Sequence, residues 1–485
     1  MPAMNLRRRD LLKLAMASGA GALLAACQPK VIKETVVVEK QVEKVVKETV
    51  VVKEAVEVQK EVTRVVEKVV QKEAAKEPVT LRLHYRAGGE TSEVPIYITR
   101  PKEFTEETGI QVKLEPIPGA EYWAKVETMA AGGTLGDNMF TTEQGWYHSR
   151  MVHFAILTPI DDIMDAQGVK RDEWLDAAIG ACTFGGKTYG LPKCAHPGYC
   201  YIRVNHALLD AAGIPIPPVQ GNTWEQIMEW GNKLSTGPKE KRDQYGYFIA
   251  KDAFQAVING LHSWGGWEIE EDRMSVKADS EAWKNWVRWN YQALVTDKIS
   301  PLASELGTAG SVGLFAAGKL ALFHGDRSQQ RAVVEAVGKP DSGKFKWSAI
   351  AMPVTSAFVG HGLSMNSHAG TSQSQHKIES FKLTYALSDK RFANLVANDQ
   401  GYLVGRTNEL DEIGEAKNDP FIQLQYEEGT KGTPYRIGKN LRGTEYDKAI
   451  RNTLDTVYMG QAQPDDAFFG KLNADLNDIL QRPVP

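Results

Sequence analysis

Several glycine-containing loops combine flat aromatic side chains with carboxylate, basic or imidazole groups. The clearest is Trp264-Gly265-Gly266-Trp267, in which two indole rings flank a Gly-Gly turn. Aromatic rings can cover the C–H face of a pyranose, while fixed polar groups hydrogen-bond to its hydroxyls. The pattern therefore predicts a sugar-binding site. The candidate ligand residues in these loops are Glu90, Glu143, Trp146, Trp264, Trp267, Asp326, Arg327 and His361.

Motifs that would indicate catalysis are absent from the sequence. It contains no G-x-S-x-G elbow, no H-E-x-x-H pair, no P-loop and no dinucleotide-binding fingerprint. The ten histidines are scattered, so we expect neither a catalytic residue nor a metal site, and no cofactor. A carboxylate pair for glycoside hydrolysis would be brought together only by folding. A secreted carbohydrate-active hydrolase therefore stays open as the alternative.

Composition and charge point to an ordinary globular protein that does not bind nucleic acid. Hydrophobic residues make up 42% and charged residues 24% of the 485 residues. The net charge is −4, but residues 79–485 alone carry 42 basic and 50 acidic groups, a net −8. An acidic body repels phosphate backbones at long range. All 11 tryptophans lie beyond residue 122, which places the packed core in the same region.

The first 26 residues have the features of an export signal. A basic start that includes Arg8-Arg9 precedes a short apolar run from Leu14 to Ala26. The arginine pair resembles a twin-arginine signal, although a general secretory signal stays open because Arg7 replaces the usual Ser or Thr. Leu24-Ala25-Ala26-Cys27 resembles a bacterial lipobox, which implies a diacylglyceryl group on Cys27 and attachment to the membrane.

Residues 27–78 form a repetitive stalk after the lipobox. Residues 31–72 divide into three 14-residue copies rich in Val, Lys and Glu, and threonine recurs at 35, 49 and 63. Fourteen residues equal two heptads, which favours a coiled coil with weak self-association. The high valine content lowers helix propensity, so an extended, charge-balanced tether is the alternative. In either form the stalk is a spacer.

From Val79 onward, alternating strands and helices predict an α/β body. Strands are expected at 79–85, 110–114 and 138–142, and a helix is expected to begin at Pro101 and end at Gly109. Asn222 or Thr223 can cap a helix that runs to Leu234. Trp283, Trp286 and Trp289 share one helical face, which predicts core packing.

Three cysteines lie in the body, at positions 182, 194 and 200. An odd number in an exported protein leaves at least one thiol outside any internal disulfide. The sequence allows either a bridge between Cys194 and Cys200 or three reduced, buried thiols.

Six segments, in their observed order, resemble motifs of the family 1 extracellular solute-binding proteins of ABC transporters. Gly136 stands where the family has proline, so the turn there departs from the family pattern. The six segments are Phe104–Val112, Gly132–Asp137, Leu157–Asp162, Gly186–Pro192, Val204–Gly213 and Thr223–Glu225.

This resemblance implies a two-lobed periplasmic-binding-protein-like fold with the ligand in a cleft between α/β lobes. By position, the chain should cross between the lobes near Pro192–Pro197, near Met352-Pro353 and near Tyr402–Arg406, and Tyr402 joins the candidate ligand residues. The implied first lobe is 79–194 plus 353–403, and the second is 195–352 plus 404–485.

The resulting hypothesis is an extracytoplasmic, membrane-anchored lipoprotein that captures a sugar or oligosaccharide and delivers it to an ABC permease without turnover. A binding protein for peptide or another small solute is a further alternative. The expected partners are a small carbohydrate, the permease subunits and, through the lipid, the membrane. Nucleic acid is not expected as a partner.

Overall fold

The computed structural model describes residues 78–87, 94–142, 147–251, 253–308, 310–326 and 329–483. The predicted export signal, Cys27 and the repetitive stalk lie outside the described residues. Residues 74–485 form one compact unit by their internal contacts, and the description below concerns that unit.

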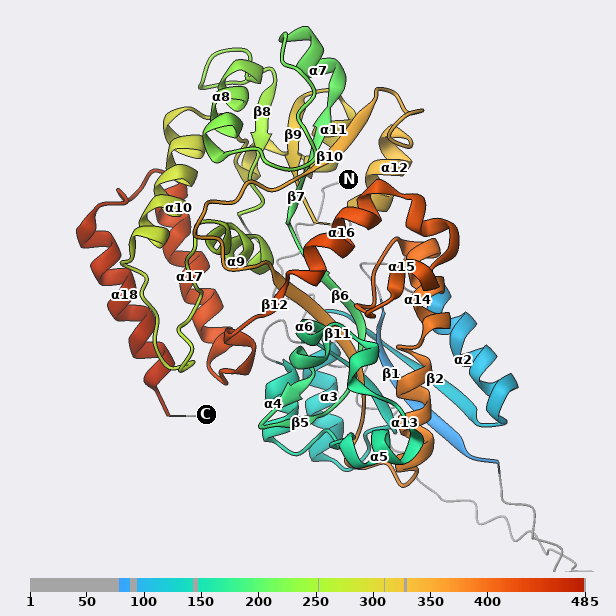
Figure 1. Ribbon diagram of the computed structural model, residues 1–485. Helices are drawn as coiled ribbons and strands as arrows, with labels where there is room; N and C mark the ends of the chain where they lie inside the picture. The colour runs from blue at the N-terminus through green and yellow to red at the C-terminus, as the bar shows by residue number, and fades with distance from the viewer. Residues whose placement is uncertain are drawn as a thin grey trace, which may run out of the picture. The chain divides into compact units, whose positions relative to one another are not determined.

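The larger of two main sheets has the strand order β12-β11-β3-β1-β2, and β6 also pairs with β11 (Figure 1). Strands β1, β2 and β3 are mutually parallel, whereas β11 runs antiparallel to β3 and to β6. The strands are β1 (Thr80–Ala87), β2 (Gln111–Pro118), β3 (Asn138–Thr142), β6 (Leu191–Pro197), β11 (Gly362–Gly370) and β12 (Thr433–Pro434).

Helices cover both faces of this sheet. Leu81, Leu83 and Tyr85 of β1 pack against α2, α13 and α14 in one core cluster, while Met139 of β3 packs against α3 and α4 in another. The helices of this part are α2 (Val94–Thr108), α3 (Tyr122–Ala131), α4 (Tyr147–His153), α5 (Asp161–Gln167), α6 (Asp176–Ala181), α13 (Lys377–Ala386), α14 (Lys390–Gln400), α15 (Glu409–Glu412) and α16 (Pro420–Thr430).

The smaller sheet has the order β10-β7-β9-β8. Strand β7 runs antiparallel to both of its neighbours, and β8 is parallel to β9. Its strands are β7 (Tyr201–Asn205), β8 (Tyr245–Phe248), β9 (Leu320–His324) and β10 (Trp347–Ala351). A short hairpin of β4 (Thr183–Phe184) and β5 (Lys187–Thr188) stands apart from both main sheets.

Two hydrophobic clusters enclose the smaller sheet. The larger cluster joins Ile202 and Leu322 to the buried faces of α8, α9, α10, α17 and α18, and a second one joins Phe323 to α11 and α12. The helices are α7 (His206–Ala211), α8 (Trp224–Leu234), α9 (Phe254–Ser263), α10 (Glu281–Tyr291), α11 (Gly310–Ala316), α12 (Gln330–Val337), α17 (Gly443–Tyr458) and α18 (Asp466–Gln481).

Most expected elements are present. Strand β1 begins one residue later than predicted, and Thr223 caps α8 in a capping box with Gln226. Trp283 and Trp286 are almost fully buried in the core. The predicted start at Pro101 is wrong, because α2 begins at Val94 and carries Pro101 inside it. The helix ends as predicted, where Gly109 adopts a left-handed φ of 74°.

The two hydrophobic cores indicate where the chain passes between the sheets for the third time, a crossing expected near Tyr402–Arg406. Tyr402, Val404, Ile413 and Ile422 all pack in the core of the larger sheet, together with residues of β1 and α2. Tyr435 and Ile437, which follow β12, pack in the main core of the smaller sheet. The change from one core to the other therefore falls between Ile422 and Tyr435, and Phe421 and Leu424 of α16 also pack with Tyr201 of the smaller sheet.

Three further findings concern the predicted chemistry. Cys182, Cys194 and Cys200 are buried thiols outside any disulfide, which is the second of the two alternatives. Within the described ranges, no helix is long and apolar enough to cross a membrane. In the same residues, no group of three or more His, Cys, Asp or Glu side chains is placed to hold a metal ion.

Candidate ligand site between the two sheets

In both sheets, the edge at which most strands end lies next to the segments that connect the two sheets. In the larger sheet β1 and β3 end at the same edge as β6, because β11 is antiparallel to both β3 and β6. In the smaller sheet β8, β9 and β10 end at the edge where β7 begins. Since the chain passes directly from β6 to β7, these two edges adjoin (Figure 1). Ligand sites of α/β folds lie at such carboxyl edges.

The first connection between the sheets is the short segment 198–200. Tyr199 has a left-handed φ of 57°, and its carbonyl accepts a hydrogen bond from His324 Nε2 at 2.8 Å. Burial lowers the pKa of His324 to about 4, so the imidazole is neutral near pH 7 and its Nε2 must carry the hydrogen. The end of β9 is thereby fixed to the connection.

Asp326, two residues beyond β9, also lies at this connection. A Cβ atom on Gly198 would lie 3.2 Å from Asp326 Oδ2 and 3.3 Å from the Cβ of Gln255. The carboxylate is therefore packed directly on the glycine, which leaves little room for a larger residue at position 198. Asp326 is 9% exposed, so it stands at the margin between core and solvent.

The larger-sheet edge carries an aromatic pair that the sequence analysis missed. Trp123, in the first turn of α3, stacks on Tyr147, the first residue of α4, with ring centroids 3.8 Å apart and an interplanar angle of 6°. Both side chains are partly exposed. Both residues also follow a strand that ends at this edge, β2 or β3. The available signal was an aromatic residue just after each strand end.

The two tryptophans of the Gly-Gly loop lie in different surroundings. The Trp267 ring is covered by the Arg436 guanidinium, whose carbon lies 3.5 Å from the ring centroid. The Trp264 ring stacks at 6.1 Å on Trp224. Trp264 also lines a surface groove of about 440 Å³ together with side chains of α8 and α10. None of the residues that line that groove belongs to the larger sheet or its helices.

His361 is fully buried beside the start of β11. Its Nε2 lies 3.3 Å from Glu428 Oε2, and its carbonyl accepts the Thr433 N–H at 2.8 Å. Burial lowers the pKa of His361, which favours a neutral ring. In this structure its side chain therefore joins α16 to the connection that precedes β11.

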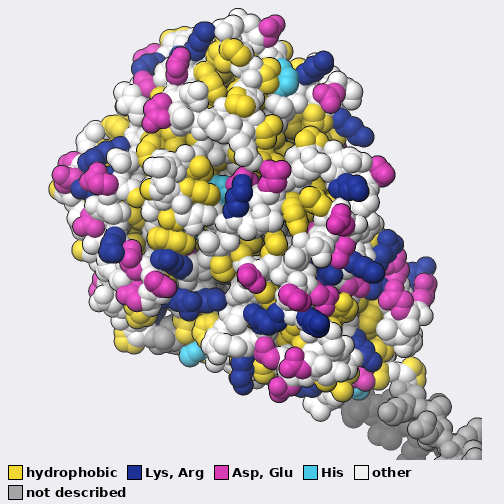
Figure 2. Space-filling view, in the orientation of Figure 1, with side chains coloured by type: hydrophobic (Ala, Val, Ile, Leu, Met, Phe, Trp, Pro, Cys, Tyr) yellow, Lys and Arg dark blue, Asp and Glu magenta, His cyan; other side chains and the backbone are white. Residues whose placement is uncertain are grey.

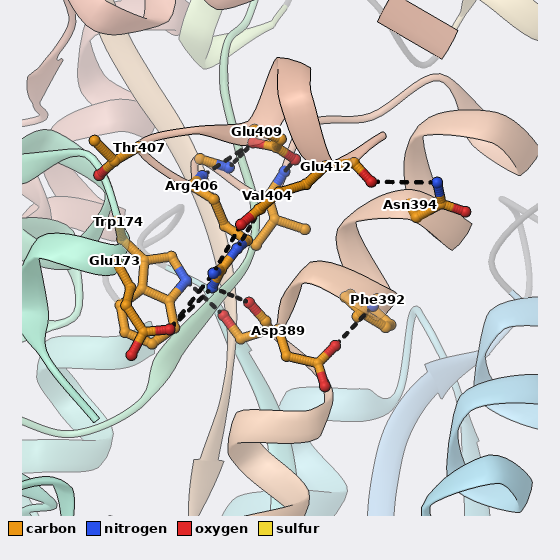
Figure 3. Close-up of polar contacts among 12 residues, drawn as sticks. Glu173, Trp174, Asp389, Phe392, Asn394, Val404, Arg406, Thr407, Glu409 and Glu412 are labelled. Carbon is orange, nitrogen blue, oxygen red and sulfur yellow. Dashed lines mark hydrogen bonds and ion pairs between the residues drawn. The ribbon is translucent and has the colours of Figure 1, made fainter. Parts of the chain in front are cut away.

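The Tyr402–Arg406 segment is held within the larger part by a polar cluster (Figure 3). The Arg406 guanidinium lies within 3.5 Å of both Glu412 and Glu173, and its carbon lies 5.5 Å from the centroid of the Trp174 ring. The Glu409 carboxylate accepts the backbone N–H groups of residues 404, 405 and 406 at 2.5, 2.7 and 3.0 Å. Tyr402 itself is 6% exposed, within the hydrophobic core.

The remaining candidates fall, by their position in the sequence, between a strand and the helix that follows it. Glu90 belongs to the segment between β1 and α2, Glu143 and Trp146 to that between β3 and α4, and Arg327 to that between β9 and α12. These four residues are outside the described ranges.

The sequence model of the family of bacterial extracellular solute-binding proteins matches residues 100–423, about two thirds of the length of the chain. The chain belongs to this family. Its members are binding proteins that act outside the cytoplasm and supply ABC permeases. No curated protein sequence matches the chain significantly.

Solved structures give the same fold at low identity. Lmo0181 from Listeria monocytogenes, solved with cycloalternan, has a TM-score of 0.69 and 16% identity, covering 83% of this chain and 99% of its own. GacH from Streptomyces glaucescens, solved unliganded and with acarbose, has a TM-score of 0.69 and 18% identity. The match covers 84% of this chain and 99% of GacH. UgpB from Mycobacterium tuberculosis, solved with glycerophosphocholine, has a TM-score of 0.69 and 16% identity. The match covers 84% of this chain and 99% of UgpB.

The shared architecture is the two-lobed α/β fold of periplasmic binding proteins, as predicted. The family likewise confirms the predicted role, a solute-binding subunit of an importer.

Proposed function

We propose that this solute-binding protein captures a carbohydrate between the adjoining edges of its two sheets and releases it unchanged to a permease. The observation that carries the proposal is the Trp123–Tyr147 stack at the edge of the larger sheet, together with the carboxylate of Asp326 at the first connection between the sheets. A partly exposed indole face can cover the apolar side of a pyranose, and a fixed carboxylate can accept hydrogen bonds from its hydroxyls.

The loops at the strand ends are proposed to complete the site. Glu90, Glu143, Trp146 and Arg327 are retained as ligand contacts because each belongs to a segment that follows β1, β3 or β9. The buried candidates His361 and Tyr402, the partly buried Trp267 and the groove residue Trp264 are proposed to support the cleft rather than to touch the sugar. Their observed contacts are with other protein groups.

The proposed larger lobe comprises 79–194 and 353–403, as expected from the sequence, with the segment 404–430 added. Packing of Val404, Ile413 and Ile422 in the core of the larger sheet supports this addition. The proposed smaller lobe comprises 198–352 and the chain from about 435 to 485, which includes Tyr435 and Ile437 of its core, because residues 195–197 belong to β6 of the larger sheet.

Attachment to the membrane is proposed through a diacylglyceryl group on Cys27, with residues 27–78 as the spacer. Support comes from the Leu24–Cys27 pattern at the end of an apolar run and from the extracellular character of the family. Mass spectrometry of the membrane fraction should find acylated Cys27 as the N-terminal residue. An unmodified N-terminus beyond Cys27 would contradict the anchor.

The chemistry of the edge residues favours a neutral sugar over a charged headgroup. Among the structural relatives, Lmo0181 was solved with cycloalternan and GacH with acarbose, whereas UgpB was solved with glycerophosphocholine. The aromatic stack suits the C–H face of a sugar, and Asp326 would repel a phosphodiester although the neighbouring Arg327 would attract it. A carbohydrate is therefore the first ligand class to test.

The test is a thermal-shift and calorimetric screen of the purified protein. The panel comprises cycloalternan, acarbose, maltotetraose, glycerophosphocholine and a tetrapeptide. A ligand that binds only the folded state stabilises it by about 2.7 kcal/mol at a concentration 100 times its Kd. We expect one carbohydrate to raise Tm and bind with 1:1 stoichiometry, and Asp326→Asn to weaken it. Product formation over many turnovers would favour the hydrolase, and a shift with glycerophosphocholine or peptide alone would overturn the sugar assignment.

A further inference from the structure

Helix α9 of the smaller part and the loop that follows it make contact with all three connections between the sheets. The first connection is 198–200, the second is the segment 352–361 between β10 and β11, and the third is 435–437, which follows β12. The contacts come from Asn259 and His262 on α9 and from Glu268 in the loop that follows. These three side chains are fully buried.

Asn259 joins the first connection to the end of the second. Its amide nitrogen donates to the Gly198 carbonyl, and its amide oxygen accepts the Gly362 N–H at 2.7 Å. The side-chain nitrogen also lies 3.4 Å from the Gly362 carbonyl. One side chain thus holds the point where the chain leaves β6 and the point where it enters β11.

His262 contacts the second connection through one ring nitrogen and Glu268 through the other. Nδ1 lies 3.0 Å from the Gly360 carbonyl oxygen, and Nε2 lies 2.8 Å from Glu268 Oε2. A carbonyl oxygen only accepts, so Nδ1 carries a hydrogen. The contact between Nε2 and Glu268 Oε2 needs a further hydrogen between these two atoms, bound either to the ring or to the carboxyl group. In either case the His262–Glu268 pair has no net charge. Thr355 adds a bond from its N–H to the Ser263 carbonyl at 2.8 Å.

Glu268 holds the third connection. Its Oε1 accepts the backbone N–H groups of Arg436 at 2.6 Å and Ile437 at 3.1 Å, while Oε2 faces His262. Burial acts to raise the pKa of Glu268, but the hydrogen bonds from His262 and the backbone outweigh it and lower that pKa. Glu268 therefore accepts these hydrogen bonds as an ionised carboxylate.

We propose that Asn259, His262 and Glu268 are positioning residues for lobe closure. Their hydrogen bonds hold all three connections on the smaller lobe, so that the chain must bend on the larger-lobe side of these bonds. The inference rests on the proposed capture of ligand between the lobes. Hinge motions are absorbed by a few residues at element ends. The first and second connections each have a glycine at their bond, namely Gly198 and Gly360, and Gly360 has a left-handed φ of 94°.

The first experiment measures amide hydrogen exchange of the unliganded protein. In Glu268→Ala the amides of Arg436 and Ile437 lose a charged acceptor, and we expect about tenfold or faster exchange there. In Glu268→Gln the carbonyl oxygen can still accept both amides, and the NH₂ group can donate to Nε2 of a neutral His262. We therefore expect protection close to that of the unaltered protein.

Tyr97→Phe is the matched control. It removes a hydrogen bond of 2.9 Å between fully buried Tyr97 and His368 in the larger lobe, remote from α9. We expect it to lower overall stability without selective loss of protection at 355–362 or 435–438. If Glu268→Ala does not fold, Asn259→Ala tests the same claim. It should speed exchange of the Gly362 amide and leave Arg436 and Ile437 protected.

The second experiment measures the distance between the lobes in the unliganded protein. Spin labels at Lys102→Cys and Lys233→Cys, both exposed, report on α2 and α8. Loss of the ties should broaden the distance distribution in Glu268→Ala or Asn259→Ala, but not in Glu268→Gln or Tyr97→Phe. Unchanged exchange and width in the alanine variants, or equal broadening in Tyr97→Phe, would overturn the proposal. Neither readout uses a ligand, so a failure of the sugar assignment leaves this test intact.

Discussion

Trp123 is the residue on which the proposed sugar contact depends most. Its ring is pre-positioned by the stack on Tyr147, and it is partly exposed. A ring held in place loses little entropy when a ligand covers it. Trp123→Ala removes that face, and Kd for the carbohydrate found in the screen should rise about tenfold to hundredfold, since burial of a large apolar side chain contributes about 1.5–3 kcal/mol.

Calorimetric titration of Trp123→Ala and Trp123→Phe against the unaltered protein checks this prediction. The phenylalanine variant keeps part of the apolar face and should lie between the other two. Trp283→Phe, a change in the buried core of α10, serves as the control and should affect stability more than affinity. Equal affinity of all variants would show that the stack does not contact the ligand.

Glu409 is a second residue whose surroundings determine a measurable property. Burial raises its pKa from 4.5 to about 7, although three backbone N–H groups donate to its carboxylate. Between these two pH values the unfolded chain loses the proton while the folded protein retains it. The contribution of this group to folding is fully present below about pH 4.5 and is lost as the pH rises through about 7, a change of about 3 kcal/mol.

Urea unfolding at half-unit steps from pH 4.5 to 8 tests the Glu409 prediction. The difference in free energy of unfolding between the unaltered protein and Glu409→Gln should fall steadily across this range. The glutamine variant has a constant cost of its own, because its NH₂ group faces backbone N–H groups, so only the slope is diagnostic. A difference independent of pH would contradict the raised pKa.

At the scale of elements, Gly136 explains why the turn before β3 departs from the family pattern. A Cβ atom there would lie 2.8 Å from the Arg82 carbonyl and 2.9 Å from His84 Nε2 on β1. The Gly136 N–H also donates to that same Nε2 at 2.8 Å. Proline would remove the donor as well as clash. The glycine thus allows the segment into β3 to lie directly on β1.

We expect Gly136→Ala to destabilise the protein by about 1–3 kcal/mol, the usual cost of overpacking a buried site. The free energy of unfolding from urea titration measures it. Gly470→Ala is the control, because a Cβ at that helical position would meet nothing within 4 Å, and it should leave stability unchanged or slightly higher. If Gly136→Ala is as stable as the unaltered protein, β1 can shift away from the added methyl group at little cost in free energy.

Local pattern predicted the elements well and the long-range contacts poorly. Alternation predicted β1, and the Thr223 cap predicted the start of α8, because both depend on neighbouring residues. The start of α2 was missed, since a proline inside a helix looks locally like a first residue. The burial of His361 and Tyr402 depends on partners far along the chain, Glu428 and the core of the larger sheet, which no spacing rule reveals.

At the scale of the whole molecule, charge and shape separate a solute carrier from a nucleic-acid binder. On the face in Figure 2, Lys and Arg side chains are interspersed with Asp and Glu rather than gathered into a basic stripe. Residues 79–485 carry a net −8. Such a surface gives no electrostatic attraction to a phosphate backbone. This charge distribution is compatible with the proposed recognition of an uncharged solute at the adjoining edges of the two sheets.

Enclosure requires the two lobes to move, and a ligand can shift that movement only through contacts made in the closed form. With spin labels at Lys102→Cys and Lys233→Cys, saturating carbohydrate should change the mean distance by more than about 2 Å and narrow its distribution. The native Cys182, Cys194 and Cys200 are buried and should stay unlabelled. The same labels in Trp123→Ala, at the same ligand concentration, should report mostly the open form. A ligand that binds with no change in distance would show that capture occurs on one lobe alone.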